Sequence, residues 1–179
     1  ALPISRLDPT RTSLGGTKNQ LILNKVTGAH WLWGASYMWD SPGLETNDVG
    51  RLNDAGDIRG NFNLNYRVTT PGRRLRAWNI NTILATLHYF GGELGLQRWL
   101  QQQSNWTFLN FWKLTGNWSF TSRNLDPVIT RGGPSMQAPR KFNVNGSLSN
   151  SPSAQTRWTA YASYDRTEDG DYLRTTNGS

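Results

Sequence analysis

The sequence has no cysteine, only two histidines, and only 17% charged residues among its 179 positions. Without cysteine there can be no disulfide framework and no thiolate metal site. No stretch approaches the roughly 18 consecutive apolar residues of a transmembrane helix, and residues 1–14 lack the charged and apolar regions of a signal peptide. A charged fraction well below the usual value of about 25% is atypical of a water-soluble enzyme.

Aromatic residues are abundant instead, with 9 Trp, 6 Tyr and 6 Phe. This content excludes a disordered chain, and the length fits a single domain. The net charge is +7, but the arginines are scattered. The densest basic cluster, Arg73, Arg74 and Arg76 beside Trp78, begins a predicted strand at a short turn. We therefore expect no nucleic-acid partner, although arginine next to an aromatic ring can hold a single strand.

Apolar and polar residues alternate strictly along several segments. In 59–69, Phe62 and Leu64 fall on one face and Asn61 and Asn63 on the other, which is the pattern of a strand with one apolar and one polar face. The same period runs through 106–120, with Leu109 and Phe111 as exceptions, and through 141–149 and 156–165. Further strands are predicted over 19–26, 30–40, 73–90 and 93–103.

These segments predict an all-β, antiparallel, up-and-down meander of about eight long strands, forming an outer-membrane-type β-barrel or part of one. Strands in soluble proteins usually have about 5–6 residues, whereas a membrane-spanning strand needs about 9–11. The predicted domain covers 1–179, with ordered strands over about 19–165 and flanking segments 1–18 and 166–179.

The predicted connections alternate in length. Thr27–Ala29, Pro71-Gly72, Ser104-Asn105 and 150–155 are short, whereas 41–58 and 121–140 are long; Gly91-Gly92 is a tight exception. Short turns at one end and long loops at the other are typical of outer-membrane barrels. A soluble β-sandwich or small ligand-binding barrel also alternates and remains an alternative.

Tryptophans lie near the ends of the predicted strands, with Trp106 and Trp118 near opposite ends of one strand. Trp gathers at membrane–water interfaces because its ring is apolar and its N–H needs a polar partner. Core packing and a sugar-stacking platform are the alternatives, and the asparagines of the polar face suit either a hydrated interior or a glycan. The predicted interface residues are Trp31, Trp33, Trp39, Trp78, Trp106, Trp118 and Trp158.

Three blocks carry a resemblance to a known family. They are Gly15-Gly16-Thr17, the segment 44–52 (LETNDVGRL) with Asn47, Asp48 and Gly50, and the run Thr130, Arg131, Gly132, Gly133 and Pro134. Together they resemble the C-terminal region of the bacterial domain-of-unknown-function family 5916, over about residues 15–165. Members of this family pair an N-terminal family-9-like carbohydrate-binding domain with a predicted outer-membrane barrel.

The resemblance implies a β-barrel in the outer membrane of a Gram-negative bacterium, with the lipid bilayer as partner, and it transfers no catalytic residue. Family barrels are longer, and another strand begins near Asp171. We therefore expect a barrel fragment or a shortened relative, whose edges are covered by strand closure, by the remainder of the barrel or by another chain. Four predicted strands separate the two motif loops, which therefore emerge at one, extracellular, end.

No catalytic, metal or cofactor site is predicted. His30 and His88 have no nearby nucleophile signature, no motif pairs the glutamates for glycoside hydrolysis, and the spacing of Asp48, Asp54 and Asp57 matches no EF-hand. The sequence thus predicts a non-enzymatic structural or transport-type barrel segment. The alternative is a soluble β-sheet carbohydrate-binding module that uses Trp and Asn side chains, and an enzyme of unknown type is a third hypothesis.

Overall fold

In the computed structural model, the chain is described over residues 15–41, 44, 56–90, 97–126, 136–168 and 170–178. These residues form strands and turns. None of them builds a helix long and apolar enough to cross a membrane. The strands are β1 (Lys18–Lys25), β2 (Trp31–Asp40), β3 (Asp57–Val68), β4 (Leu75–Tyr89), β5 (Gln97–Phe108), β6 (Lys113–Thr121), β7 (Asn124–Asp126), β8 (Met136–Ala138), β9 (Lys141–Ser149), β10 (Thr159–Thr167) and β11 (Gly170–Gly178).

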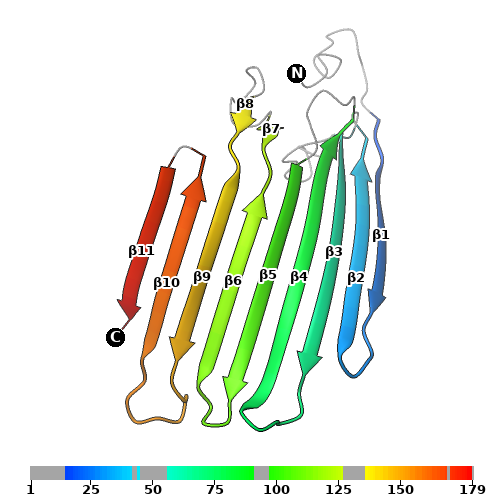
Figure 1. Ribbon diagram of the computed structural model, residues 1–179. Helices are drawn as coiled ribbons and strands as arrows, with labels where there is room; N and C mark the ends of the chain where they lie inside the picture. Colours follow the sequence, from blue (N-terminus) through cyan, green and yellow to red (C-terminus); the bar gives the residue numbers. More distant parts are fainter. Residues whose placement is uncertain are drawn as a thin grey trace.

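Nine of these strands form one antiparallel sheet in the order β1-β2-β3-β4-β5-β6-β9-β10-β11 (Figure 1). Each strand pairs with its neighbours along the chain except across β7 and β8, which pair with each other as a separate hairpin. The all-β, antiparallel, up-and-down meander expected from the sequence is confirmed. The sheet does not close on itself, because β1 and β11 each have a single neighbour in the described structure.

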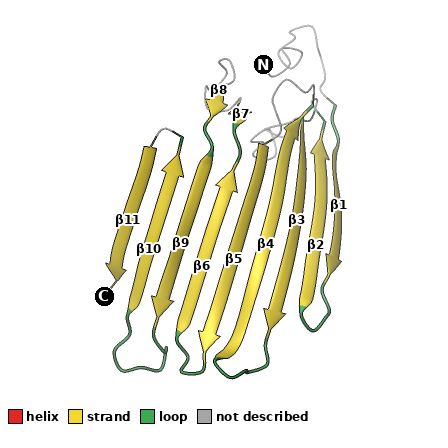
Figure 2. Cartoon of the chain, viewed as in Figure 1, coloured by secondary structure: helices red, strands yellow, loops and turns green. Residues whose placement is uncertain are grey.

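The connections fall into two groups at the two ends of the sheet (Figure 2). The β1–β2, β3–β4, β5–β6 and β9–β10 connections lie at one end, the short-turn end. The two long connections, β2–β3 and β6–β9, both start and finish at the opposite end, the long-loop end. The predicted separation of short turns from the two long loops is therefore present in the fold.

The predicted strand over 106–120 is wrong. β5 continues through Ser104-Asn105 to Phe108, the chain turns at 109–112, and β6 begins at Lys113. Leu109 and Phe111 break the alternation because they belong to the turn, where Phe111 adopts a φ of 64°. As a consequence, Trp106 and Trp118 lie on two different strands rather than at opposite ends of one.

The remaining boundaries shift by smaller amounts. The 93–103 segment, whose glutamines also suit a helix, contains the first half of β5, and the long 121–140 connection carries the β7–β8 hairpin. β10 spans Thr159–Thr167 rather than 156–165, and β11 begins at Gly170, beside the strand start expected near Asp171.

The described residues do not enclose a hydrophobic core. Among the described hydrophobic residues only Tyr89 is buried, with 8% of its surface exposed. The nine-stranded sheet is a single layer: its inner strands have one neighbour on either side, and no second sheet packs against it in the described structure. Ligands, lipids or partners can therefore contact the protein on either face of this layer.

Candidate functional site: the two faces of one sheet

The register of the sheet sorts its side chains into an apolar face and a polar face. Residues directly opposite each other in an antiparallel pair point to the same side. Trp33 pairs with Leu64, and a row runs through Phe62, Leu84, Leu100, Phe120 and Phe142 across five strands. The alternation read from the sequence thus continues, strand after strand, as one apolar surface.

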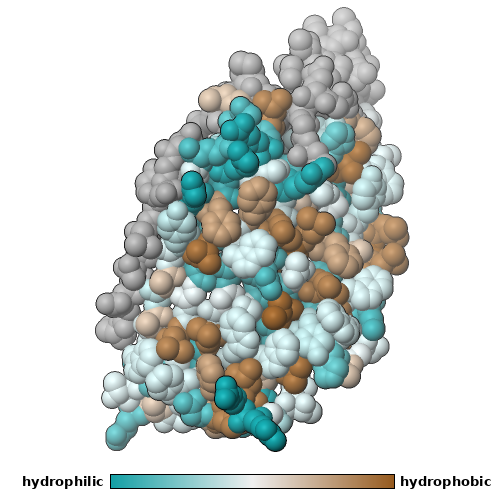
Figure 3. Space-filling model, viewed as in Figure 1, coloured by the Kyte–Doolittle hydropathy of each residue, from teal (hydrophilic) through white to brown (hydrophobic). Residues whose placement is uncertain are grey.

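This apolar face is open in the described structure. Figure 3 shows it as a broad region of hydrophobic and aromatic side chains, with strongly hydrophilic ones gathered toward the two ends. Many of its large apolar side chains are exposed. The exposed ones are Leu21, Leu23, Trp31, Trp33, Tyr37, Phe62, Leu84, Phe120, Phe142 and Val144.

Charged residues are confined to the ends of this face. On the sheet strands with described side chains, the charged residues in register with the apolar face are Lys25, Arg98 and Arg166. Lys25 ends β1 at the short-turn end, and the two arginines lie within one residue of strand ends at the long-loop end. The middle of the apolar face is free of charge across the strands whose side chains are described.

Two polar side chains in the middle of this face are satisfied within the sheet. Trp118 Nε1 donates a hydrogen bond of 2.7 Å to Gln102 Oε1, directly across β6 and β5. The Ser104 hydroxyl donates to the Gly116 carbonyl at 3.1 Å. Such internal pairing is needed where no water can replace a lost partner.

Where water is excluded from this face, Gln102→Leu should destabilise the folded protein by about 1 kcal/mol, because Trp118 Nε1 loses its acceptor. The urea midpoint of the folded protein measures this loss. The double variant Gln102→Leu/Trp118→Phe removes both partners and should recover most of it. If water contacts this face, Gln102→Leu alone will leave the midpoint unchanged.

Aromatic rings cluster at the short-turn end. Trp31 lies edge-on to Tyr66 at 4.6 Å between centroids, and Tyr66 lies 5.2 Å from Trp78. Trp78 is paired with Trp106 in the register. Trp158, just before β10, packs edge-on against Trp112 at 5.3 Å.

Three further predicted interface residues, Trp33, Trp39 and Trp118, lie on the apolar face. Trp33 and Trp39 follow Trp31 on β2, and Trp39 lies at the long-loop end with Tyr37 5.6 Å away. Trp118 lies near the middle of the sheet rather than at an end, since it pairs with Gln102 in the middle of β5. Apart from Trp158, the predicted tryptophans therefore share the apolar face.

The opposite face is lined by amides and hydroxyls. One row carries an amide or hydroxyl at every position across six strands: Asn65, Asn81, Gln103, Asn117, Asn145 and Ser163. Neighbouring side chains bond one another, as Gln101 Nε2 does with Asn117 Oδ1 at 2.6 Å. Amides both donate and accept, so this polar surface needs little charge.

Two ion pairs mark the polar face at the long-loop end. Asp40 and Asp57 are almost fully buried, at 1% and 0% exposure. Lys18 Nζ lies 3.3 Å from Asp40 Oδ2, and Arg59 donates to Asp57 Oδ2 through Nε at 3.0 Å and through a second guanidinium nitrogen. Each pair joins one positive to one negative side chain, and both pairs lie at the strand ends that flank the long β2–β3 connection.

A third cluster anchors the β7–β8 hairpin. Glu168, in the turn after β10, accepts from Arg123 Nε at 2.6 Å and from Arg140 Nε at 2.7 Å. Arg123 precedes β7 and Arg140 follows β8. The two guanidinium groups lower the pKa of Glu168 to about 2, so the clamp stays charged at any pH a cell experiences.

We expect the clamp to lose its effect only in strong acid. Because the pKa of Glu168 is depressed in the folded state, its contribution is present above the ordinary value of 4.5 and declines as pH falls toward about 2. Protection of the β7 and β8 amides from hydrogen exchange should therefore be full at pH 6, reduced at pH 3 and largely lost near pH 2. Glu168→Gln should lower this protection at pH 6 and have little effect near pH 2; unchanged protection at pH 6 in this variant would contradict the role of the clamp.

The predicted motif loops lie outside the described residues. These positions are Asn47, Asp48, Gly50, Thr130, Arg131, Gly132, Gly133 and Pro134. The strand ends that flank them, Asp40, Asp57, Thr121 and Lys141, all lie at the long-loop end. In the described residues, no group of three or more His, Asp or Glu could hold a metal ion.

The fold and its faces define a class: a single-layer, two-faced antiparallel sheet. The chain belongs to the family described as Domain of unknown function (DUF5916), whose model matches residues 2–175. A search of curated proteins and a search of solved structures gave no match at the threshold applied.

Proposed function

We propose that this sheet is part of the wall of a non-enzymatic β-barrel in the outer membrane of a Gram-negative bacterium, of structural or transport type. The apolar face contacts lipid and the polar face lines a hydrated interior. One observation carries the proposal: an apolar surface eight strands wide, exposed in the described structure and charged only at its ends.

The hydrophobic effect makes water an unsuitable neighbour for this face. Full burial of a large apolar side chain is worth about 1.5–3 kcal/mol, and this face leaves a continuous set of such side chains 37–55% exposed. Soluble monomers rarely expose apolar patches beyond a few hundred Å². Lipid covers such a face without a second protein layer.

The dimensions of the strands agree with a bilayer. From Trp31 to Trp39, β2 covers about 27 Å at about 3.4 Å per residue. At the tilt of about 35–45° usual in outer-membrane barrels this spans about 19–22 Å of an apolar band about 25 Å tall. The cluster of Trp31, Tyr66 and Trp78 at the short-turn end would then lie at one interface. The long loops would lie at the other, extracellular, interface.

The direction of the edge strands determines how the wall can close. Nine consecutive antiparallel strands make β1 and β11 run the same way, as the arrows in Figure 1 show. Direct pairing of β1 with β11 would be parallel. An all-antiparallel ring therefore needs an odd number of further strands, which gives the even total usual for bacterial barrels. These strands, from elsewhere in a longer protein or from another chain, would satisfy both edges.

The proposal is tested by extraction and gel migration. We expect the protein to stay monodisperse only with detergent or lipid, and to migrate differently on a denaturing gel before and after boiling. A chain that purifies as a stable monomer without detergent would contradict membrane insertion. In that case a soluble sheet that binds carbohydrate through Trp and Asn becomes the better explanation.

A further inference from the structure

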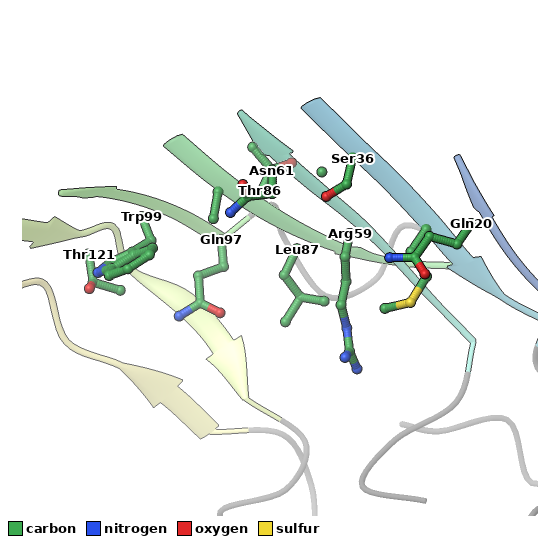
Figure 4. A pocket seen from close by; sticks show the side chains of 12 residues that line it. Gln20, Ser36, Arg59, Asn61, Thr86, Leu87, Gln97, Trp99 and Thr121 are labelled. Atoms are coloured by element: carbon green, nitrogen blue, oxygen red, sulfur yellow. The ribbon is translucent and has the colours of Figure 1, made fainter. Parts of the chain in front are cut away.

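The polar face contains a hollow near the long-loop end. It has a volume of about 630 Å³ and is lined by side chains from β1 to β6, among them Met38, Arg59, Leu87, Gln97 and Trp99. Figure 4 shows Arg59, Leu87 and Gln97 pointing to one side, into the concave curve of the sheet. The volume falls within the range of small-molecule binding sites.

Trp99 is the unexpected residue of this hollow. Of the described tryptophans in strands, it alone has a register position on the polar face, where it pairs with Ala85 on β4 and Thr121 on β6. Both partners have small side chains, and the Trp99 side chain is half-buried. Contact with lipid explains the tryptophans of the apolar face but does not explain Trp99.

The charged side chains described at the hollow and its rim are paired with opposite charges. Arg59 bonds Asp57, and at the rim Lys18 bonds Asp40. The other polar lining groups are amides and hydroxyls, such as Gln20, Ser36, Asn61, Gln97 and Thr121. A free anion or cation would find no unmatched charge among these pairs, whereas a neutral molecule rich in hydroxyls would find both donors and acceptors.

The amides continue beyond the hollow along one strand. The polar-face positions of β5 are Gln97, Trp99, Gln101, Gln103, Asn105 and Thr107. Trp99 thus lies within a line of amides that covers about 27 Å from Gln97 to Asn105 at about 3.4 Å per residue. The line fits an extended ligand better than a single compact one.

We propose that this hollow and the amide line of β5 bind a linear, neutral oligosaccharide, with one sugar ring stacked on Trp99. A sugar presents a C–H face to an aromatic ring and hydroxyls to amides, which is the combination of groups found here. The inference deepens the proposed function: if the polar face lines the barrel interior, the oligosaccharide lies against the inner wall.

Calorimetric titration of the detergent-solubilised protein tests this directly. The probes are maltohexaose, cellohexaose and xylohexaose, with a galacturonic acid hexamer as the anionic comparison. We expect saturable binding of at least one neutral probe that changes little between low and high salt. Binding of none of the neutral probes, or stronger and salt-sensitive binding of the anionic one, would overturn the proposal.

Matched variants locate the site. Trp99→Ala should weaken binding by about tenfold or more, whereas Leu100→Ala, the next residue on the other face, should leave affinity unchanged. Ala85→Leu places a larger side chain at the register position beside Trp99 and should also weaken binding. Equal affinity in Trp99→Ala and the parent chain would overturn the proposal, and if Trp99→Ala does not fold, Ala85→Leu decides in the same way.

Failure of this inference and failure of the proposed function give different results. Membrane insertion is read from gel migration, which Trp99→Ala should not change. If the chain inserts into membranes but binds no neutral sugar, the barrel proposal stands and the sugar-site proposal is wrong. If the chain needs no detergent but binds sugar through Trp99, the sugar-site proposal stands and the barrel proposal is wrong.

Discussion

Leu84→Arg should sharply reduce the fraction of protein that folds into lipid vesicles, whereas Ile83→Arg should leave it close to that of the parent chain. The two residues are neighbours in the middle of β4. Leu84 is 44% exposed on the apolar face, in register with Phe62 and Leu100. Ile83 is in register with Asn63 and Gln101 on the polar face.

The expected effect of Leu84→Arg is about 2–4 kcal/mol, the cost of an arginine at the bilayer midplane on the lipid face of a barrel. At position 83 the same arginine meets amides and water. Heat-modifiable migration and urea midpoints in vesicles measure both variants. In water, an arginine in place of an exposed leucine would be harmless, so an unaffected or more soluble Leu84→Arg protein would contradict the orientation of the sheet.

Asp57→Asn should lower the free energy of unfolding by about 2 kcal/mol. Asp57 is fully buried at the start of β3 and accepts two hydrogen bonds from Arg59. The amide keeps the shape but removes the charge and turns an N–H₂ group toward guanidinium donors. The loss stays below that of a fully buried pair because the Arg59 side chain is 42% exposed.

The double variant Asp57→Asn/Arg59→Met provides the control. Removing both charges should recover a large part of the loss, because no guanidinium is then left beside a neutral amide. Urea midpoints for the parent, the two single variants and the double variant give the coupling between the residues. A coupling near zero would show that the pair does not stabilise the start of β3.

Alternation was the most informative signal in the sequence. It predicted the two faces wherever one face of a strand is uniformly apolar, as in β3, where Phe62 and Leu64 alternate with asparagines. The signal weakens in β5, because Gln102 and Ser104 occupy apolar-face positions and are satisfied by Trp118 and Gly116. Such cross-strand hydrogen bonds cannot be read from one strand alone.

The turn at 109–112 was missed for a related reason. It contains neither glycine nor proline, and Leu109, Phe111 and Trp112 look like strand residues. The one local signal is Asn110, whose Oδ1 accepts from the Trp112 amide at 3.2 Å, as asparagine does in turns. Phe111 is held partly by Arg76 at the start of β4, whose guanidinium lies 4.6 Å from its ring centroid.

The candidate sugar site could not be predicted because its residues are distant in sequence. Trp99 was not distinguished from the other tryptophans until the register placed it opposite Ala85 and Thr121. The same holds for the two ion pairs, since Lys18 and Asp40 meet only through the pairing of β1 with β2. The local sequence pattern predicts where a strand runs and which face each side chain is on. A site that joins several strands can be located only when the pairing register of those strands is known.

Spin labels along β4 test the central claim most directly, and the absence of cysteine makes every introduced cysteine a unique labelling point. Single labels at 80 to 87 in vesicles should show a period of two. Labels at even positions should collide with lipid-soluble oxygen and labels at odd positions with a water-soluble nickel complex. Uniform access to the nickel complex, or exclusion of both reagents from the even positions, would contradict a sheet that faces lipid on one side and water on the other.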